Sequence, residues 1–112
     1  MGGMAAGVRV AQAGVYYQAL ALQKLGEAGR AKALFQQLID TGTLTLAKTS
    51  DLASGTNVPL AQRLQAADAH YLTGLGQRGL NEKDKARQEF SLALQASPDH
   101  WAAKTALAGM TP

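Results

Sequence analysis

Two stretches of this 112-residue chain repeat one pattern, and this internal repeat restricts the possible folds more than any other feature. When Tyr16–Asp40 is aligned without gaps to Tyr71–Gln95, six of the 25 positions are identical. The identical pairs are Tyr16/Tyr71, Leu20/Leu75, Leu25/Leu80, Glu27/Glu82, Ala31/Ala86 and Phe35/Phe90. They fall on apolar positions and at a polar corner, so the sequence predicts two copies of one structural unit.

Each copy has the pattern of two short helices that fold against each other. In the second copy, apolar or small side chains recur at helical spacing on both sides of a polar corner. They are Tyr71, Gly74, Leu75 and Leu80 before the corner, and Ala86, Phe90, Ala93 and Leu94 after it. Gly26 and Asn81 stand at equivalent corners, and both residue types adopt the left-handed conformation that follows many helices. Pro98 ends the last helix of the copy, because proline lacks a backbone N–H and restricts the residue before it.

This pattern resembles the tetratricopeptide repeat, a helix–turn–helix unit of about 34 residues with an A-x3-F element and a closing proline. The matching residues are Gly74 in the first helix and Ala86, Phe90, Ala93 and Pro98 in the second. His70 and Gln77 stand where the family often has tryptophan and tyrosine. The resemblance implies an all-α fold, in which antiparallel helix hairpins stack as a short right-handed superhelix of about five helices.

The chain is expected to form a single domain over residues 1–112, with repeat 1 at about 8–40 and repeat 2 at about 60–98. A longer helix is expected over Leu60–Gly79. A capping helix is expected at about 99–109, with Asp99 as its N-cap and Trp101–Ala108 as its helical part. Repeat arrays need such a terminal helix to cover the exposed end of the last unit.

The offset between the copies, which takes Tyr16 to Tyr71, exceeds the usual repeat length, so roughly 21 extra residues separate them. They fall in a Thr/Ser/Gly-rich insertion at about 41–59, whose residue types oppose a helix. We expect this insertion to be a flexible surface excursion. The alternatives are a lid or clasp over a binding surface and a short helix around Leu46–Leu52.

Composition excludes several classes of protein. The chain has no cysteine, which excludes disulfides and thiolate metal sites. The net charge of +3 is dispersed, so nucleic acid is not an expected partner, although RNA binding remains a weak alternative. The basic residues that such binding would use are Arg63, Arg78, Lys83, Lys85 and Arg87. No run is apolar enough to span a membrane, and no secretory signal is recognisable, so the cytoplasm is the default location.

No arrangement typical of an enzyme is present. His70 and His100 are the only histidines, and neither has a partner at the helical spacing of a metal site. Gly74–Gly79 spells G-x-G-x-x-G, but the dinucleotide fingerprint must follow a strand and open a helix. Here the glycines fall inside a predicted helix. We therefore expect no catalysis, metal, cofactor or small-molecule substrate.

In the family that the chain resembles, the first helix of each unit lines a concave groove that holds a peptide or a partner helix. The groove positions that carry over are Ala13, Tyr16, Tyr17, Leu20 and Lys24 in the first copy, and Asp68, Tyr71, Leu72, Leu75 and Arg78 in the second. Such an apolar surface with tyrosines suits an amphipathic helix or the flank of another protein. Several of these residues, Leu20 and Leu75 above all, could instead belong to the core.

Two functions are therefore expected as alternatives. The first is a non-catalytic protein–protein interaction module that binds a peptide or amphipathic helix. A homodimer through the tyrosine faces would fit this function and the second one equally. The second is an accessory helical-repeat tail of a larger bacterial protein, serving packing or oligomerisation. That protein could be a carbohydrate-related enzyme, because Tyr17–Leu22 resembles tails of this kind. A groove filled by the chain itself would favour the second function.

Overall fold

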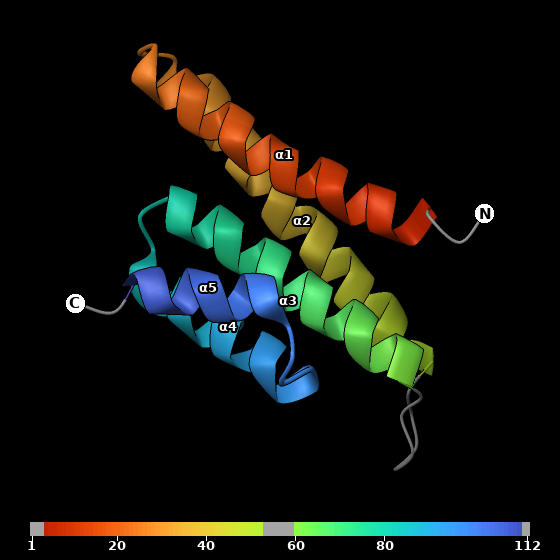
Figure 1. The fold of residues 1–112 in the computed structure, drawn as a ribbon. Helices are drawn as coiled ribbons and strands as arrows, with labels where there is room; N and C mark the ends of the chain where they lie inside the picture. Colours follow the sequence, from red (N-terminus) through yellow and green to blue (C-terminus); the bar gives the residue numbers. More distant parts are fainter. Residues whose placement is uncertain (1–3, 53–59, 111–112) are drawn as a thin grey trace.

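The structure, a computed structural model, describes the backbone of residues 4–52 and 60–110 and the side chains of residues 14–48 and 60–110 (Figure 1). The described residues form five helices: α1 (Met4–Lys24), α2 (Ala28–Leu52), α3 (Leu60–Gly79), α4 (Lys83–Ala96) and α5 (Trp101–Met110). No β-strand occurs in the described part of the chain. The predicted all-α class and the predicted number of helices are confirmed.

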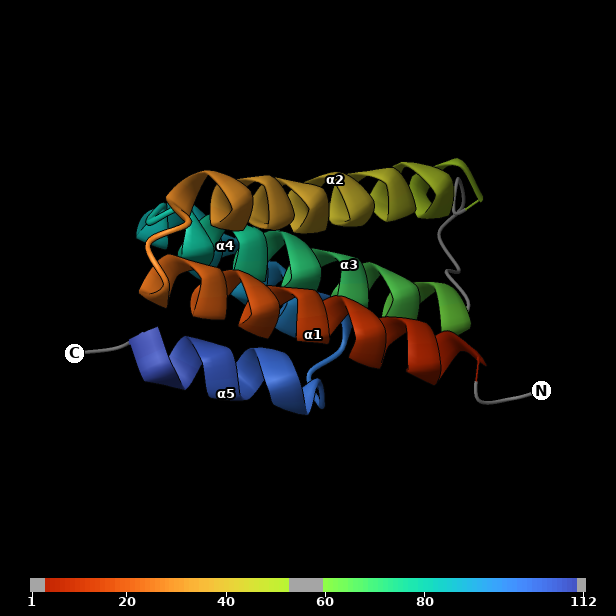
Figure 2. The same cartoon turned by 90° about the horizontal axis from the view of Figure 1, so that it is seen from above.

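Helix α3 lies at the centre of the molecule, with α2 on one side and α4 on the other (Figure 1). Helix α1 packs against α2, and α5 packs mainly against α4. In the view from above, α4 and α5 lie alongside one half of α3, and the other half extends beyond them together with the end of α2 (Figure 2). The most extensive contacts therefore join helices that are consecutive in the chain, as in a stack of helical hairpins, and α1 makes a smaller contact with α3.

The two hairpin corners are built from the same backbone hydrogen bonds at equivalent positions of the two copies. After α1, the N–H of Glu27 donates back to the carbonyl of Leu22 at 2.9 Å, and after α3 the N–H of Glu82 donates back to the carbonyl of Gln77 at 2.8 Å. Gly26 (φ 85°) and Asn81 (φ 68°) are both left-handed, as predicted. This is the Schellman arrangement, which satisfies the last carbonyls of a helix.

The cores of the two hairpins also match. The rings of Tyr16 and Phe35 lie 5.9 Å apart, and the equivalent rings of Tyr71 and Phe90 lie 6.0 Å apart. Both phenylalanines are almost completely buried. The main core contains Tyr16, Ala19, Ala31, Phe35, Leu38, Leu72, Leu75, Ala86 and Phe90, and a smaller cluster contains Ala67, Ala93 and Ala103. The apolar stripes that the sequence predicts are thus the ones that pack.

The boundary between α4 and α5 agrees with the prediction from Pro98. Helix α4 ends at Ala96, and Ser97 has an extended backbone (φ −146°, ψ 98°), as expected for the residue before a proline. Helix α5 begins at Trp101 as predicted, but it continues through Gly109 to Met110. Helix α1 begins at Met4, before the expected start of repeat 1 at residue 8.

The expected flexible insertion at 41–59 is wrong from Thr41 to Leu52, because α2 continues without a break to Leu52. The Thr45 hydroxyl donates to the carbonyl of Thr41 at 2.9 Å within the helix. Gly42 lets α2 approach α3 so closely that a Cβ on it would lie 2.6 Å from the carbonyl oxygen of Ala69. Packing against α3 therefore overrides the weak helix propensity of this stretch. The rest of the expected insertion, residues 53–59, lies outside the described part of the chain. The alternative of a lid or clasp therefore finds no support up to Leu52, where the chain is helical.

Candidate protein-interaction surface

The expected binding residues of α1 divide between two faces of the helix. Tyr16 is buried, and Leu20 is half-buried against the core. Tyr17, with 66% of its surface exposed, and Lys24 point to the other side. The side chain of Ala13 lies outside the described residues. Helix α1 therefore leaves Tyr17 and Lys24 exposed, while Tyr16 and Leu20 belong to the hairpin core.

Tyr16 has a structural environment. Its ring lies against the rings of Phe35 and, at 5.5 Å, Tyr17. Burial raises the pKa of its hydroxyl, which the positive charge of Arg78 partly opposes and the neighbouring Tyr17 slightly reinforces. Because burial disfavours the phenolate, Tyr16 acts as a neutral packing residue.

The expected binding residues of α3 are largely covered by the rest of the chain. Leu72 and Leu75 are buried in the main core, and Arg78 is half-buried. The carboxylate of Asp68 lies 2.7 Å from Nε2 of His100, the residue that precedes α5. The centroid of the Tyr71 ring lies 6.0 Å from that of Phe90 and 5.3 Å from that of His100. The chain thus occupies this part of the expected groove itself.

His100, and not the predicted Asp99, caps helix α5. Its Nδ1 accepts a hydrogen bond from the backbone N–H of Ala103 at 3.1 Å, and its own carbonyl accepts from Lys104. Because Nδ1 is an acceptor, the hydrogen must be on Nε2, which then donates to Asp68. One buried side chain therefore both starts α5 and fixes it to α3.

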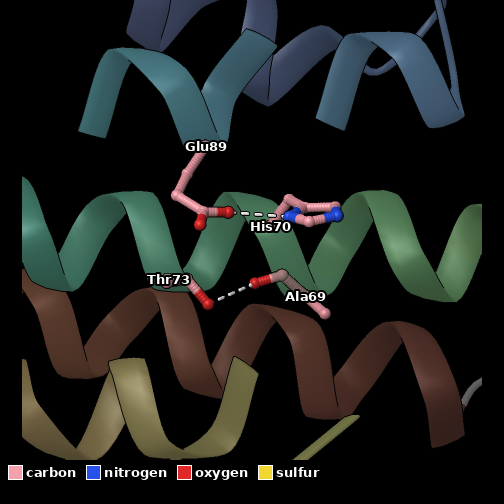
Figure 3. A network of polar contacts seen from close by, with 4 residues as sticks. All are labelled: Ala69, His70, Thr73 and Glu89. Atoms are coloured by element: carbon pink, nitrogen blue, oxygen red, sulfur yellow. Dashed lines mark hydrogen bonds and ion pairs between the residues drawn. The ribbon is translucent and has the colours of Figure 1, made fainter. Parts of the chain in front are cut away.

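A second histidine–carboxylate pair joins α3 to α4. Nδ1 of His70 lies 2.7 Å from Oε2 of Glu89. In Figure 3 the Glu89 side chain reaches from α4 to His70 on α3, and the hydroxyl of Thr73 donates within α3 to the carbonyl of Ala69 at 2.9 Å. Sequence reasoning missed both pairs, because their members are 19 and 32 residues apart and no local spacing marks them.

The three glycines of the G-x-G-x-x-G stretch serve helix packing. They lie on α3, and a Cβ on Gly74 would lie 2.6 Å from the ring of Phe90. On Gly76 it would lie 2.5 Å from the carbonyl oxygen of Phe35, and on Gly79 it would overlap the ring of Phe35. The stretch is inside a helix, so it lacks the strand–turn–helix context of a phosphate-binding loop. Close helix contact explains these glycines.

The surface left open is the side of α1 that faces away from α2, which we name the α1 outer face. Its members are Gly14, Tyr17, Gln18, Ala21, Lys24 and Leu25, all exposed. The equivalent face of α3 is formed by Ala69, Leu72, Thr73, Gly76, Gly79 and Leu80, all buried or half-buried. In α3 this face receives α2; in α1 no described element covers it. It is the best candidate for contact with a partner.

Other kinds of site find little support among the described residues. They contain no group of three or more histidine, cysteine, aspartate or glutamate side chains that could hold a metal ion. None of the described helices is both long enough and apolar enough to cross a membrane. Two of the basic residues considered for RNA are in ion pairs within α4 and its corner: Lys85 with Glu82 at 3.1 Å, and Arg87 with Asp84 at 3.7 Å.

Comparison with protein-family models, with curated proteins and with solved structures finds no match to this chain.

Proposed function

We propose that this chain is a non-catalytic protein–protein interaction module that binds a polypeptide, either a peptide or an amphipathic helix, through the α1 outer face. The observation that carries the proposal is the exposure of Tyr17. Its equivalent in the second copy, Leu72, is buried in the main core. In the second copy the equivalent surface is covered by a helix. An exposed tyrosine on the uncovered surface of the first copy therefore suits contact with a partner.

The proposal includes a tetratricopeptide-like organisation, with two hairpins and α5 as the cap. Support comes from the matching corners at Gly26 and Asn81 and from the matching Tyr–Phe ring pairs. Further support is the position of α5, which covers the last hairpin as a capping helix does. The opposite end of the stack, at α1, has no such cover among the described residues, and this asymmetry directs the binding site to α1.

One observation favours the alternative function, an accessory tail of a larger bacterial protein that serves packing or oligomerisation. Asp68, Tyr71 and Leu75, expected to line the groove, contact the rest of this chain instead. Under this alternative the α1 outer face packs against the remainder of the larger protein. Both functions use the same surface and differ in whether the partner is a separate polypeptide.

The test is site-specific photo-crosslinking. A photoreactive phenylalanine analogue is placed at Tyr17 and, as a matched control, at the exposed Lys104 of α5. Each protein is irradiated in an extract of the source organism. We expect a crosslink to a polypeptide from Tyr17 only, and we expect it to be competed by excess unlabelled wild type and not by the Tyr17→Ala variant. Equal crosslinking at both positions, or none at Tyr17, would overturn the proposal.

A further inference from the structure

Helix α2 packs on the outer face of α3, the first helix of the next hairpin. This interface shows at which spacing the residues of a packing helix meet such a face. Phe35, Ile39 and Gly42, at positions i, i+4 and i+7 of α2, contact α3. Phe35 lies over Gly79, Ile39 over Gly76, and Gly42 over Thr73 and Ala69, all of them along one face of α3. Any helix that packs on an equivalent face in the same way will use the same spacing.

The α1 outer face is that equivalent face in the first copy. Lys24 replaces Gly79, Ala21 replaces Gly76, and Gln18 replaces Thr73. An approaching helix would therefore need a carboxylate at i to meet Lys24, because a phenylalanine has no room where a lysine replaces a glycine. It would need an aliphatic side chain at i+4 to cover Ala21, and a small residue at i+7. Lys24 is exposed and has no ion-pair partner among the described residues.

Helix α2 of the same chain carries this combination on its exposed side. Asp40, Leu44 and Ala47 stand at i, i+4 and i+7, and all three are exposed. Leu44 has 63% of its surface exposed, which is high for a leucine. Among the acidic residues with described side chains, Asp40 alone has an exposed large hydrophobic residue four positions later. We name these three residues the α2 stripe.

We propose that the α1 outer face of one copy binds the α2 stripe of a second copy of this chain. In this contact Asp40 pairs with Lys24, Leu44 covers Ala21 beside Tyr17, and Ala47 lies near Gln18. The inference rests on the proposed function and names its partner as the chain itself. The two surfaces are different, and every copy carries both. The contact is therefore head-to-tail and can repeat from copy to copy.

The contact is short, so the association is expected to be weak. The described α1 outer face runs from Gly14 to Leu25, about 16 Å along the helix axis. A contact of about three helical turns buries little surface, and small interfaces are typical of weak complexes rather than of obligate dimers. Self-association is therefore expected to appear at high protein concentration and to weaken with added salt, since one exposed ion pair contributes to it.

The test is the mass of the purified full chain, measured by light scattering and sedimentation from about 5 µM to about 1 mM, the range of weak complexes. We expect the average mass to rise with concentration beyond that of a dimer. Lys24→Glu and Asp40→Lys are each expected to weaken association about 3–20-fold, because each replaces an attraction by a repulsion. The double variant Lys24→Glu/Asp40→Lys restores it, and the matched control Lys104→Glu leaves it unchanged. Circular dichroism confirms that each variant is folded.

Three results would overturn the inference: a monomer at every concentration, association that Lys24→Glu leaves unchanged, or a double variant that stays as weak as the single ones. Leu44→Ser is a second probe of the apolar part and is expected to reduce association about tenfold or more. Failure here is distinct from failure of the proposed function. A chain that stays monomeric while Tyr17 still crosslinks to another polypeptide would overturn self-association and leave the proposed function in place.

Discussion

The hairpins α1–α2 and α3–α4 are built alike on the inside and differently on the outside. Within each hairpin, a tyrosine of the first helix stacks on a buried phenylalanine of the second, at ring distances of 5.9 and 6.0 Å. Each corner has the same pair of hydrogen bonds around a left-handed residue, Gly26 or Asn81. Each corner also carries the same surface ion pair, Glu27–Arg30 or Glu82–Lys85. The two hairpins therefore share the same ring packing in the core and the same construction of the corner.

The difference lies on the face of the first helix that points away from its own hairpin. In α3 this face is pressed against α2, and the residues there include Gly76 and Gly79. In α1 the equivalent positions are Ala21 and Lys24, and both are exposed. Glycine is costly inside a helix, so two glycines on one face of α3 indicate a neighbour at very short distance. The residue types on an outer face thus indicate whether another helix of the same chain packs against that face.

The comparison is tested most severely at the two phenylalanines. Phe35→Ala and Phe90→Ala should each lower the free energy of unfolding by about 3–5 kcal/mol, the usual range for a buried aromatic side chain. Both are at most 1% exposed and occupy equivalent places. Urea denaturation followed by circular dichroism measures the two losses. A loss below about 1 kcal/mol for one variant, typical of a surface substitution, would contradict the structural equivalence of the hairpins.

A glycine-to-alanine substitution on each outer face tests whether that face is covered. Gly76→Ala should destabilise the protein by about 1–3 kcal/mol, because the new Cβ would meet the backbone of Phe35 and Ile39 of α2. For Gly14→Ala, the matched control on α1, the described residues place no atom from outside the adjacent backbone of α1 within 4 Å of the new Cβ. This substitution should stabilise the protein by about 0.5–1 kcal/mol through helix propensity alone.

Thermal or urea unfolding measures the change in the free energy of unfolding for each of these two glycine variants, and the signs of the two changes test the comparison. Opposite signs are expected if α3 is covered and α1 is open. Two stabilising substitutions would show that α2 does not approach α3 as closely as the structure has it. Two destabilising substitutions would show that something also covers Gly14, which a second copy of the chain could do at high concentration.

The parts of the fold that were predictable from sequence are those with local causes. The corners follow from Gly26 and Asn81, whose backbone preferences belong to single residues. The end of α4 follows from Pro98, which acts on its immediate neighbour. The hairpins follow from stripes at helical spacing, which need no knowledge of the partner. Local chemistry and the internal repeat therefore suffice for the helices.

The parts that could not be predicted depend on residues far apart in the chain. Helix α2 continues to Leu52 because Gly42 packs against Ala69 and Thr73 of α3, a contact between distant stretches of the sequence. Propensity alone favours an irregular segment there. His100 caps α5 because its ring also reaches Asp68, 32 residues earlier, and histidine is not among the preferred capping residues.

The candidate surface was predictable only in part for the same reason. The family resemblance predicts binding residues on the first helix of each copy, and the structure has helices α1 and α3 at these positions. Which side of each helix remains open depends on how α2 and α5 pack. Leu72 is buried in the main core, and His100 contacts Asp68, whereas Tyr17 and Lys24 stay exposed. Exposure is a property of the assembled fold, so equivalent positions in the two copies have different roles.

The smallest effect on stability is expected at Tyr17, and it separates the two outer faces most directly. Tyr17→Ala should change the free energy of unfolding by no more than about 0.5 kcal/mol, because the side chain is 66% exposed. Leu72→Ala, at the equivalent position of α3, should cost about 2–5 kcal/mol, because Leu72 is buried in the main core. Urea denaturation at low protein concentration, where self-association is absent, gives both values. A large loss for Tyr17→Ala would mean that Tyr17 stabilises the hairpin through its contact with the ring of Tyr16, and the α1 outer face would then be part of the fold and not a surface kept for a partner.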